Sequence, residues 1–298
     1  MTQTIFIGVD GGATKCVVRV EDETGHLLGL ATSGPANIRL SPEEAWQSIY
    51  TAIHQILQPH AISLETEGYR FHVGMGLAGL EVEEAYQAFL RRAHDFHTLI
   101  VATDAHIACL GAHAGQDGAV IIAGTGVVGF QIEQGKIAKV GGFGFPHDDI
   151  GGGAWLGLQA VQVTLQWLDG RLPLSGLASA VYAYFDHDMP RFVYWVNQAN
   201  STQFATLAPI VVHQCEQGDI MAINLMHQAG AALDSINRAL MNKQIYRNMR
   251  LPCSLVGGIA PFLTSYVSAD LRARLRSGMG TADMGAIFLI RQYLLKTH

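Results

Sequence analysis

Short apolar runs rich in β-branched residues alternate along the first half of the chain with longer segments of helical periodicity. The runs predict strands at about 4–9, 16–21, 26–32, 71–76 and 98–103. The helical segments lie at about 42–58, 82–94 and 104–113. Three successive strands followed by alternating helices and strands are typical of an α/β layer architecture.

Polar residues and prolines mark where the first of these helices begins and ends. Ser41 can cap it, and Pro42 suits the first helical position because the proline ring fixes φ. Pro59 follows the last periodic residue and should end the helix.

The strand pattern restarts at Gly118. Strands are expected at about 119–123, 127–133, 136–141 and 254–256, helices over most of 153–241, and a final helix at about 282–294. We interpret this half as a second copy of the same half-fold. The polar stretch 115–118 predicts the boundary, with an N-terminal domain of residues 1–116 and a C-terminal domain of residues 117–298 that carries a helical insertion. The last helix is expected to pack back on the N-terminal domain.

Composition and charge narrow the possible partners. With 298 residues, 49% of them hydrophobic, the chain can bury the cores of two domains. A formal net charge of −6 without a basic cluster argues against a nucleic-acid or anionic-membrane partner. No signal-peptide pattern and no unbroken membrane-spanning run are present. The four cysteines (Cys16, Cys109, Cys215 and Cys253) lack CxxC spacing, which favours reduced thiols in a cytoplasmic protein.

Two strands run directly into turns that are unusually rich in glycine. The first strand ends in Asp10-Gly11-Gly12-Ala13-Thr14-Lys15, and the strand at 119–123 ends in Gly124-Thr125-Gly126. Without a Cβ to keep it away, a glycine backbone can place its N–H groups against an anion. Two such turns predict that the phosphate chain of a nucleotide is gripped from both sides of a cleft.

Two common phosphate-binding motifs do not account for these turns. The P-loop pattern G-x-x-x-x-G-K-[ST] is absent from the sequence. Residues 124–129 fit G-x-G-x-x-G, but a dinucleotide site needs a helix after the turn, so that the helix N-terminus meets the pyrophosphate. Here residues 127–132 predict another strand, and a Rossmann oxidoreductase is therefore disfavoured.

Glycine turns between neighbouring strands, used twice, resemble the phosphate motifs of the actin-like, sugar-kinase and Hsp70 ATPase superfamily. Residues 10–15 are similar to its first phosphate motif, residues 123–126 to its second and residues 256–259 to its adenosine motif. Within this superfamily the chain resembles the N-acetylglucosamine and glucosamine kinases of the BadF/BadG ATPase group. The other matching segments follow in the same order over nearly the whole chain: 33–37, 76–79, 103–105, 141–144 with Asp149, and 204–205 with 217–219.

The resemblance implies a two-domain actin-like ATPase (ribonuclease H-like) α/β fold with a nucleotide cleft between the domains. It implies ATP and Mg²⁺ as cofactors, with Asp10 facing the metal or its water shell. The residues matched to nucleotide contacts are Asp10, Gly11, Gly12, Thr14 and Lys15 in the first turn, Gly124, Thr125 and Gly126 in the second, Gly257 and Gly258 beside the adenosine, and Ala205 in the base pocket.

Asp104 is the expected catalytic residue. It follows a predicted parallel strand, and open α/β sheets place their ligands at the carboxyl ends of such strands. Transfer of a phosphoryl group to a sugar needs a carboxylate that accepts the hydroxyl proton. Asp also favours the N-cap of a helix, and both roles can hold together.

The sugar contacts are also implied by the resemblance. Asn37 and Asp149 are matched to residues that hydrogen-bond ring hydroxyls, and Gly142, Phe143 and Gly144 to the segment that cradles the substituent at C2. Several departures lie near that substituent: Val127 stands where Ser is common, Phe143 where Trp is common and Ile150 where an acidic residue is common, and His147-Asp148 is unusual. They leave open whether the sugar carries an acetyl group.

The sequence as a whole predicts an ATP-dependent kinase that phosphorylates the C6 hydroxyl of N-acetylglucosamine, in amino-sugar catabolism or recycling. Free glucosamine is the alternative substrate. Since related kinases are often dimers, we expect a cytoplasmic homodimer without a nucleic-acid or membrane partner. More remote alternatives are an activator ATPase, which holds an iron–sulfur cluster through closely spaced cysteines, and a non-catalytic sugar sensor.

Overall fold

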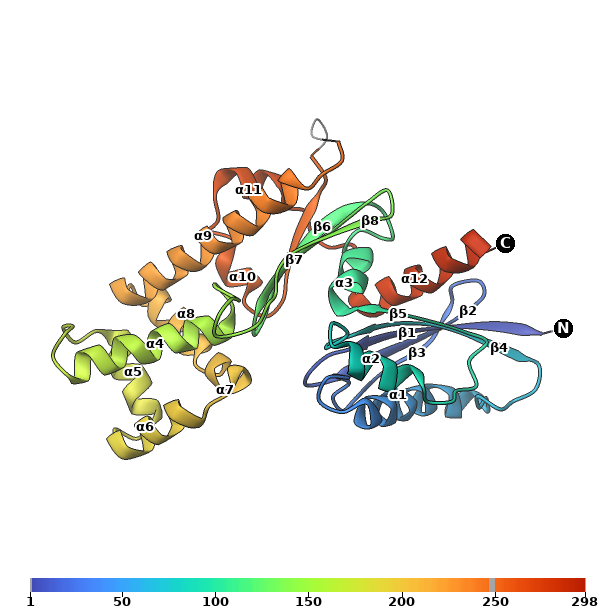
Figure 1. Ribbon diagram of the computed structural model, residues 1–298, viewed down its shortest axis with the longest axis horizontal. Helices are drawn as coiled ribbons and strands as arrows, with labels where there is room; N and C mark the ends of the chain where they lie inside the picture. The colour runs from blue at the N-terminus through green and yellow to red at the C-terminus, as the bar shows by residue number, and fades with distance from the viewer. Residues whose placement is uncertain (1, 247–249, 298) are drawn as a thin grey trace. The chain divides into compact units, whose positions relative to one another are not determined.

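The computed structural model describes residues 2–246 and 250–297 of the chain (Figure 1). The chain divides into two compact units, each built around its own β-sheet. Unit 1 comprises Met1–Gly118 and Ser277–His298, and unit 2 comprises Ala119–Arg276. The C-terminal segment therefore folds together with the N-terminal part of the sequence.

Unit 1 contains a five-stranded sheet with the strand order β3-β2-β1-β4-β5. Its strands are β1 (Gln3–Gly11), β2 (Cys16–Asp22), β3 (Leu27–Ser33), β4 (Tyr69–Leu77) and β5 (Thr98–Thr103). The first three form an antiparallel meander, whereas β1, β4 and β5 run parallel. The register pairs Asp10 with Gly76 and Leu77 with Thr103, so the carboxyl ends of the parallel strands lie side by side.

Helices cover both faces of this sheet. They are α1 (Pro42–Leu57), the short 3-10 helix η1 (Gln58–His60), α2 (Glu83–Leu90), α3 (Asp104–Ala112) and α12 (Ala282–Thr297). Figure 1 shows α1 and α12 on opposite sides of the sheet. Ile7 and Val9 are buried in the cluster that includes α1, whereas Phe6 packs with Ile287 of α12. Because strand residues alternate between faces, Asp10 shares the side of Phe6 and α12.

The ends of α1 agree with the sequence signals. The Ser41 hydroxyl accepts a hydrogen bond from the Glu44 N–H at 3.1 Å, and Pro42 is the first helical residue. The helix ends at Leu57, and Pro59 lies in the 3-10 turn that follows. The predicted start and end of this helix are confirmed.

Unit 2 repeats part of this topology with a four-stranded sheet of order β8-β7-β6-β9. Its strands are β6 (Gly118–Ala123), β7 (Val127–Glu133), β8 (Lys136–Gly141) and β9 (Cys253–Val256). β7 and β8 pair antiparallel, and β6 and β9 pair parallel, which matches the order β3-β2-β1-β4 of unit 1. The predicted second copy of the half-fold is therefore confirmed.

Most helices of unit 2 belong to one long connection between β8 and β9. They are α4 (Gly153–Leu168), α5 (Gly176–Tyr184), α6 (Met189–Gln198), α7 (Ser201–Ala205), α8 (Ala208–Glu216) and α9 (Ile220–Asn242); α10 (Ala260–Leu263) and α11 (Ala269–Arg274) follow β9. Within the described part of the chain, no helix has both the length and the apolar character needed to cross a membrane.

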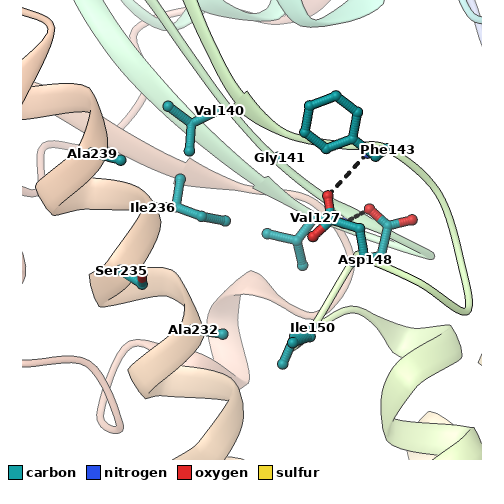
Figure 2. Close-up of a pocket in the computed structure, with 11 residues that line it drawn as sticks. Val127, Val140, Gly141, Phe143, Asp148, Ile150, Ala232, Ser235, Ile236 and Ala239 are labelled. Carbon is teal, nitrogen blue, oxygen red and sulfur yellow. Dashed lines mark hydrogen bonds between the residues drawn. The ribbon is translucent and has the colours of Figure 1, made fainter.

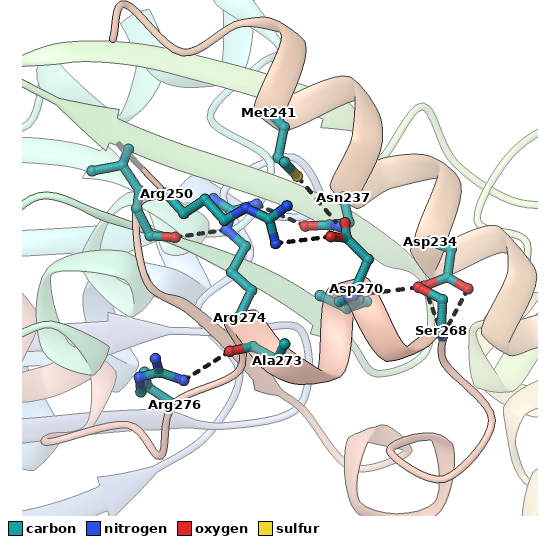
Figure 3. Close-up of polar contacts among 11 residues, drawn as sticks. Asp234, Asn237, Met241, Arg250, Ser268, Asp270, Ala273, Arg274 and Arg276 are labelled. Carbon is teal, nitrogen blue, oxygen red and sulfur yellow. Dashed lines mark hydrogen bonds and ion pairs between the residues drawn. The ribbon is translucent and has the colours of Figure 1, made fainter. Parts of the chain in front are cut away.

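A buried arginine anchors α9 to α11 and to the segment that leads into β9. Arg274 donates from Nε to the Leu251 carbonyl at 2.6 Å and from a guanidinium nitrogen to Asn237 Oδ1 at 2.7 Å (Figure 3). One turn away, Asp234 accepts hydrogen bonds from the Ser268 hydroxyl at 2.8 Å and N–H at 3.0 Å. Because an unpaired buried charge is costly, these bonds favour a single position of α9.

Glycines let α12 approach its neighbours in unit 1 closely. A Cβ on Gly285 of α12 would overlap the Ile107 carbonyl oxygen of α3. A Cβ on Gly8 of β1 would overlap the Asp283 carbonyl oxygen of α12. The backbone of α12 thus lies directly against the backbones of α3 and β1. This packing fixes the position of α3, which begins with Asp104, relative to β1.

We expect Gly285→Ala to lower the free energy of unfolding by about 1–3 kcal/mol, because the added methyl group forces α3 and α12 apart. Chemical denaturation measures the effect. Gly278→Ala is the matched control, since a Cβ there makes only ordinary contacts, with Ala112 at 3.7 Å and the Gly280 carbonyl oxygen at 3.9 Å. Equal stability of the two variants would contradict the close packing of α3 and α12.

Candidate active site

Two carboxylates of unit 1 lie at the carboxyl ends of its parallel strands. Asp10 is the penultimate residue of β1, and Asp104 follows β5 directly as the first residue of α3. The pKa of Asp10 is raised to about 6, first by burial and then by the charges of Asp104 and Asp283, while Lys15 acts in the opposite direction. The structure thus brings the predicted catalytic residue and the predicted metal-facing residue together.

Asp104 does not cap the helix that it begins. The N-cap of α3 is Thr103, whose hydroxyl accepts a hydrogen bond from the His106 N–H at 3.2 Å. The Asp104 side chain is exposed, and its Oδ1 accepts from the Ala105 N–H at 2.7 Å. The N-cap alternative for Asp104 is therefore wrong, because Thr103, one residue earlier, has the extended backbone of an N-cap and Asp104 is already the first helical residue. A carboxylate in the first turn remains favoured by the helix dipole.

The first glycine turn is closed by backbone hydrogen bonds. The Gly12 N–H donates to the Lys15 carbonyl at 3.0 Å, and the Ala36 N–H donates to the Gly12 carbonyl at 2.9 Å. Gly11 is buried, whereas the side chains of Thr14 and Lys15 are exposed. The predicted phosphate residues therefore divide into a fixed base of the turn and an accessible tip.

Asn37 lies beside this turn, at the end of β4. Its backbone forms a bridge with Ala78, whose N–H donates to the Gly11 carbonyl at 2.8 Å. Its side-chain Oδ1 accepts from the Arg39 N–H at 3.0 Å. Asn37, the first turn and Asp104 are thus grouped at one edge of the sheet of unit 1.

The second glycine turn, between β6 and β7, is held by the start of α4. The Gly124 N–H donates to the Gly126 carbonyl at 3.0 Å. The carbonyls of Gly124 and Thr125 accept from the N–H groups of Gly153 and Ala154, at 2.8 and 2.9 Å. With its carbonyls bound in this way the turn is fixed, and the Thr125 side chain is exposed.

The predicted adenosine loop follows β9, which pairs with β6. Gly257 has a φ of 104°, a region that favours glycine, and a Cβ there would overlap the Ala123 carbonyl oxygen. The same carbonyl accepts from the Ile259 N–H at 3.0 Å. A Cβ on Gly258 would meet no heavy atom within 4 Å, so the backbone at Gly258 can be approached closely.

Ala205 completes this group. It ends α7, and its Cβ lies 3.3 Å from the position of a Cβ on Gly153, the first residue of α4. The nucleotide residues expected in unit 2 therefore gather around the N-terminus of α4 and the carboxyl ends of β6 and β9.

Asp149 lies against the second glycine turn. It has a φ of 65°, its Oδ1 accepts from the Val127 N–H at 3.1 Å, and a Cβ on Gly126 would overlap its carboxylate. Burial raises the pKa of Asp149, the Val127 N–H opposes this effect, and the charge of Asp148 adds to it. Asp149 therefore joins the turn to the pocket beside it.

A pocket of about 330 Å³ opens between α9 and the loop 141–150 (Figure 2). Of the expected sugar residues, Phe143 and Asp149 line it, and Gly142 and Gly144 flank Phe143 in conformations with positive φ, at 73° and 100°. The Phe143 side chain is 87% exposed, and its N–H donates to Asp148 Oδ2 at 3.0 Å. The expected sugar residues Asn37 and Asp104 belong to unit 1, and Phe143 and Asp149 to unit 2.

Sequence analysis did not single out Asp283 or Arg19. Asp283 is only 5% exposed and accepts a hydrogen bond from Arg19 Nε at 2.7 Å. Arg19 lies between two buried valines of β2. Because side chains alternate between the two faces of a strand, the sequence indicated that Arg19 lies on the face opposite to these valines. The last helix was expected to pack on the N-terminal domain, but nothing in the sequence indicated that Asp283 at its start would contact Arg19.

Two sheets of matching strand order, each with a glycine turn after its first strand, define a two-unit α/β ATPase fold. The sequence model of the BadF/BadG/BcrA/BcrD ATPase family matches residues 7–274, and the chain belongs to this family. The predicted family and fold class are confirmed.

The three curated relatives that match the chain are all named as sugar kinases. Glucosamine kinase GspK of Vibrio cholerae is 36% identical over 282 residues, which cover 95% of this chain and 94% of the relative. An N-acetylmuramic acid/N-acetylglucosamine kinase of Clostridium acetobutylicum is 24% identical, over 85% of this chain and 84% of the relative. A solved structure from Chromobacterium violaceum, provisionally named an N-acetylglucosamine kinase, has a TM-score of 0.88 at 32% identity and covers 96% of this chain and 98% of that one.

We expect Asp10→Asn to stabilise the metal-free protein at neutral pH. Because the pKa of Asp10 is raised from 3.8 to about 6, ionisation of its carboxyl opposes folding; this cost grows between those two pH values and is complete above pH 6. At pH 4 and below, the carboxyl is largely protonated in the folded state and the cost disappears. The variant should gain about 2–3 kcal/mol of unfolding free energy at pH 7.5 and little at pH 4.

Chemical denaturation in EDTA at both pH values measures this difference. Glu84→Gln, which removes an exposed carboxylate of α2, is the control and should change stability little at either pH. A gain for Asp10→Asn that is the same at both pH values would contradict the electrostatic origin.

Proposed function

We propose that this protein transfers the γ-phosphoryl group of ATP to the C6 hydroxyl of N-acetylglucosamine, with free glucosamine as the alternative substrate. The relatives support a kinase of this sugar class, since one that is 36% identical over nearly the full length is a glucosamine kinase. The observation that carries the proposal is the exposed Asp104 carboxylate, close enough to Asp10 of the first glycine turn to raise its pKa. Phosphoryl transfer needs a proton acceptor and a phosphate-binding turn together.

Asp104 is the proposed general base. As the O6–phosphorus bond forms, the bond from the γ-phosphorus to the bridging oxygen of ADP breaks, and ADP leaves with that electron pair. The hydroxyl proton passes to the Asp104 carboxylate. The Ala105 N–H, at 2.7 Å from Oδ1, orients this carboxylate, and the N-terminus of α3 favours its charged form.

Asp10 fits the role of holding Mg²⁺. Its carboxylate is crowded by Asp104 and Asp283, and a divalent cation would offset this excess of negative charge. Mg²⁺ in such sites is commonly bound by one or two carboxylates together with substrate phosphates and water, and when bound it neutralises phosphate charge. Other residues of the same turn are proposed to contact the terminal phosphates: Gly11, Gly12, Thr14 and Lys15.

Unit 2 is proposed to bind the rest of the nucleotide. The N-terminus of α4 lies at the second glycine turn, and helix N-termini favour anionic phosphates. The proposed phosphate contacts are Gly124, Thr125 and Gly126, the proposed adenosine contacts are Gly257 and Gly258, and Ala205 is proposed to line the base pocket.

The sugar contacts proposed from the resemblance are Asn37, Asp149 and residues 142–144. A sugar site needs directional polar groups, because each buried polar group left unpaired costs about 1–3 kcal/mol. We also propose a cytoplasmic homodimer, on the resemblance to related kinases alone.

The cysteines do not support the activator ATPase. All four are buried, so they are not at the surface, where an iron–sulfur cluster shared at a dimer interface would need them. Burial raises the pKa of Cys16 to about 12 and that of Cys253 to about 11, whereas iron–sulfur ligands are thiolates. A sugar sensor would not need the exposed Asp104 carboxylate, and ATP turnover with sugar distinguishes it.

Asp104→Asn should lower kcat by at least about two to three orders of magnitude, the usual contribution of a general base. Calorimetric binding of N-acetylglucosamine and of a non-hydrolysable ATP analogue should persist, because the amide keeps the shape of the carboxylate. Glu84→Gln serves as the control with unchanged turnover. Unchanged turnover in Asp104→Asn would remove Asp104 from the mechanism.

Thr125→Val should raise the KM for ATP about 10- to 100-fold, the loss expected for a hydrogen bond to a charged group. The KM for the sugar should change little. Thr125→Ser keeps the hydroxyl and is the matched control, with a KM for ATP near that of the wild type. If Thr125→Val altered only the choice of sugar, the assignment of the second turn to phosphate would be wrong.

A further inference from the structure

Another pocket of unit 2, which we call the hairpin pocket, lies at the closed end of the hairpin formed by β7 and β8. Its volume is about 290 Å³, near the lower end of the range for small-molecule sites. Its lining comes from Gln131 and Glu133 of β7, from residues 136–139 of β8, and from Lys243 and Ile245, which follow α9. Because β7 begins at the second glycine turn and ends at this pocket, the two sites lie at opposite ends of the strand.

Positive charge is concentrated in the hairpin pocket. The chain contains five lysines, and three of them, Lys136, Lys139 and Lys243, line this pocket. All three side chains are exposed, and none of them forms an ion pair with a residue that the structure describes. In a chain with a formal net charge of −6, three ammonium groups around one cavity favour a small anion as the ligand.

A buried carboxylate fixes one side of the pocket. Glu133 accepts hydrogen bonds from the backbone N–H groups of Ile245 at 2.6 Å and Tyr246 at 3.1 Å. These bonds hold the segment after α9 against β7 and occupy both carboxylate oxygens. Three ammonium groups and one carboxylate leave two positive charges, which matches a phosphate monoester, whose charge is about −1.5 to −2 at pH 7.

Gln131 gives a second, independent indication of a ligand. Its side chain is only 2% exposed, and its Oε1 has no hydrogen-bond partner among the residues that the structure describes. A buried acceptor left unpaired costs about 1–3 kcal/mol. A hydroxyl group on the ligand would remove this cost, whereas the dianionic phosphate group of an ester has no proton to donate.

We propose that the hairpin pocket binds a phosphorylated sugar. The lysines bind the phosphate, and a sugar hydroxyl donates to Gln131 Oε1. Ile137 and Ile245, which are exposed and line the same pocket, pack against the C–H groups of the sugar. The proposal goes beyond the proposed function and does not depend on it, because the product of that reaction and other sugar phosphates share this chemistry.

Calorimetric titration of the full chain with N-acetylglucosamine 6-phosphate and with fructose 6-phosphate tests the proposal. Saturating N-acetylglucosamine and a non-hydrolysable ATP analogue keep the proposed active site occupied during the titration. We expect a sugar phosphate to bind, and the tighter of the two identifies the source of the ligand. Sulfate, which has no proton to donate, and unphosphorylated fructose should each bind more weakly, since each lacks one of the two kinds of polar contact.

Lys243→Gln should raise the Kd for the sugar phosphate and for sulfate about tenfold or more, because it removes a charge-assisted contact. Lys296→Gln removes an exposed lysine of α12 and is the matched control, with an unchanged Kd. Gln131→Met keeps a side chain of the same length without the acceptor. It should raise the Kd for the sugar phosphate about 3- to 10-fold and leave that for sulfate unchanged. Thermal melting of each variant separates loss of binding from loss of folding.

The outcomes separate this site from the proposed function. Absence of binding by both sugar phosphates would overturn the hairpin pocket, and so would equal losses in folded Lys243→Gln and Lys296→Gln. An equal effect of Gln131→Met on sulfate and on the sugar phosphate would overturn the contact between Gln131 and the sugar. If the sugar phosphate binds as expected while no amino sugar is phosphorylated, the hairpin pocket stands and the proposed function fails.

Discussion

The proposed chemistry depends on the crowding of negative charge at the end of β1. Asp10 is buried next to Asp104 and Asp283, and its pKa is raised to about 6 as a result. This arrangement disfavours the folded state at neutral pH, so the surrounding packing must enforce it. Arg19 offsets part of the charge through its 2.7 Å ion pair with Asp283. The side chains of Arg19 and Asp283 are only 16% and 7% exposed. The same crowding that destabilises the carboxylate favours a bound cation.

Backbone contacts rather than charges fix the second turn. Its carbonyls are bound by the first N–H groups of α4, and Asp149 is held to the turn through the Val127 N–H. Asp149 therefore links the proposed phosphate site to the proposed sugar pocket within unit 2. A change in the pocket next to Val127 would therefore act close to the proposed phosphate turn.

Local sequence signals located the elements well. The strands β5, β7 and β8 have the predicted bounds, because β-branched runs there end at turn residues on both sides. The two glycine turns and the strands that precede them also followed from the sequence, and with them the family and fold class. The cap of α3 was placed one residue late, at Asp104 instead of Thr103, since both residue types suit that position.

Tertiary structure alone decided which distant residues meet. The sequence placed Asp10 and Asp104 at the carboxyl ends of strands and led us to expect the last helix on the same domain, but only the packing of α12 places Asp283 near Asp10. Likewise, the motif at 141–149 was visible in the sequence, whereas its contact with Gly126 and the side chains that α9 contributes to the pocket were not. Periodicity and turn residues report the conformation of neighbouring residues, because those forces act locally. Contacts between segments far apart in the chain arise from packing, which no local pattern encodes.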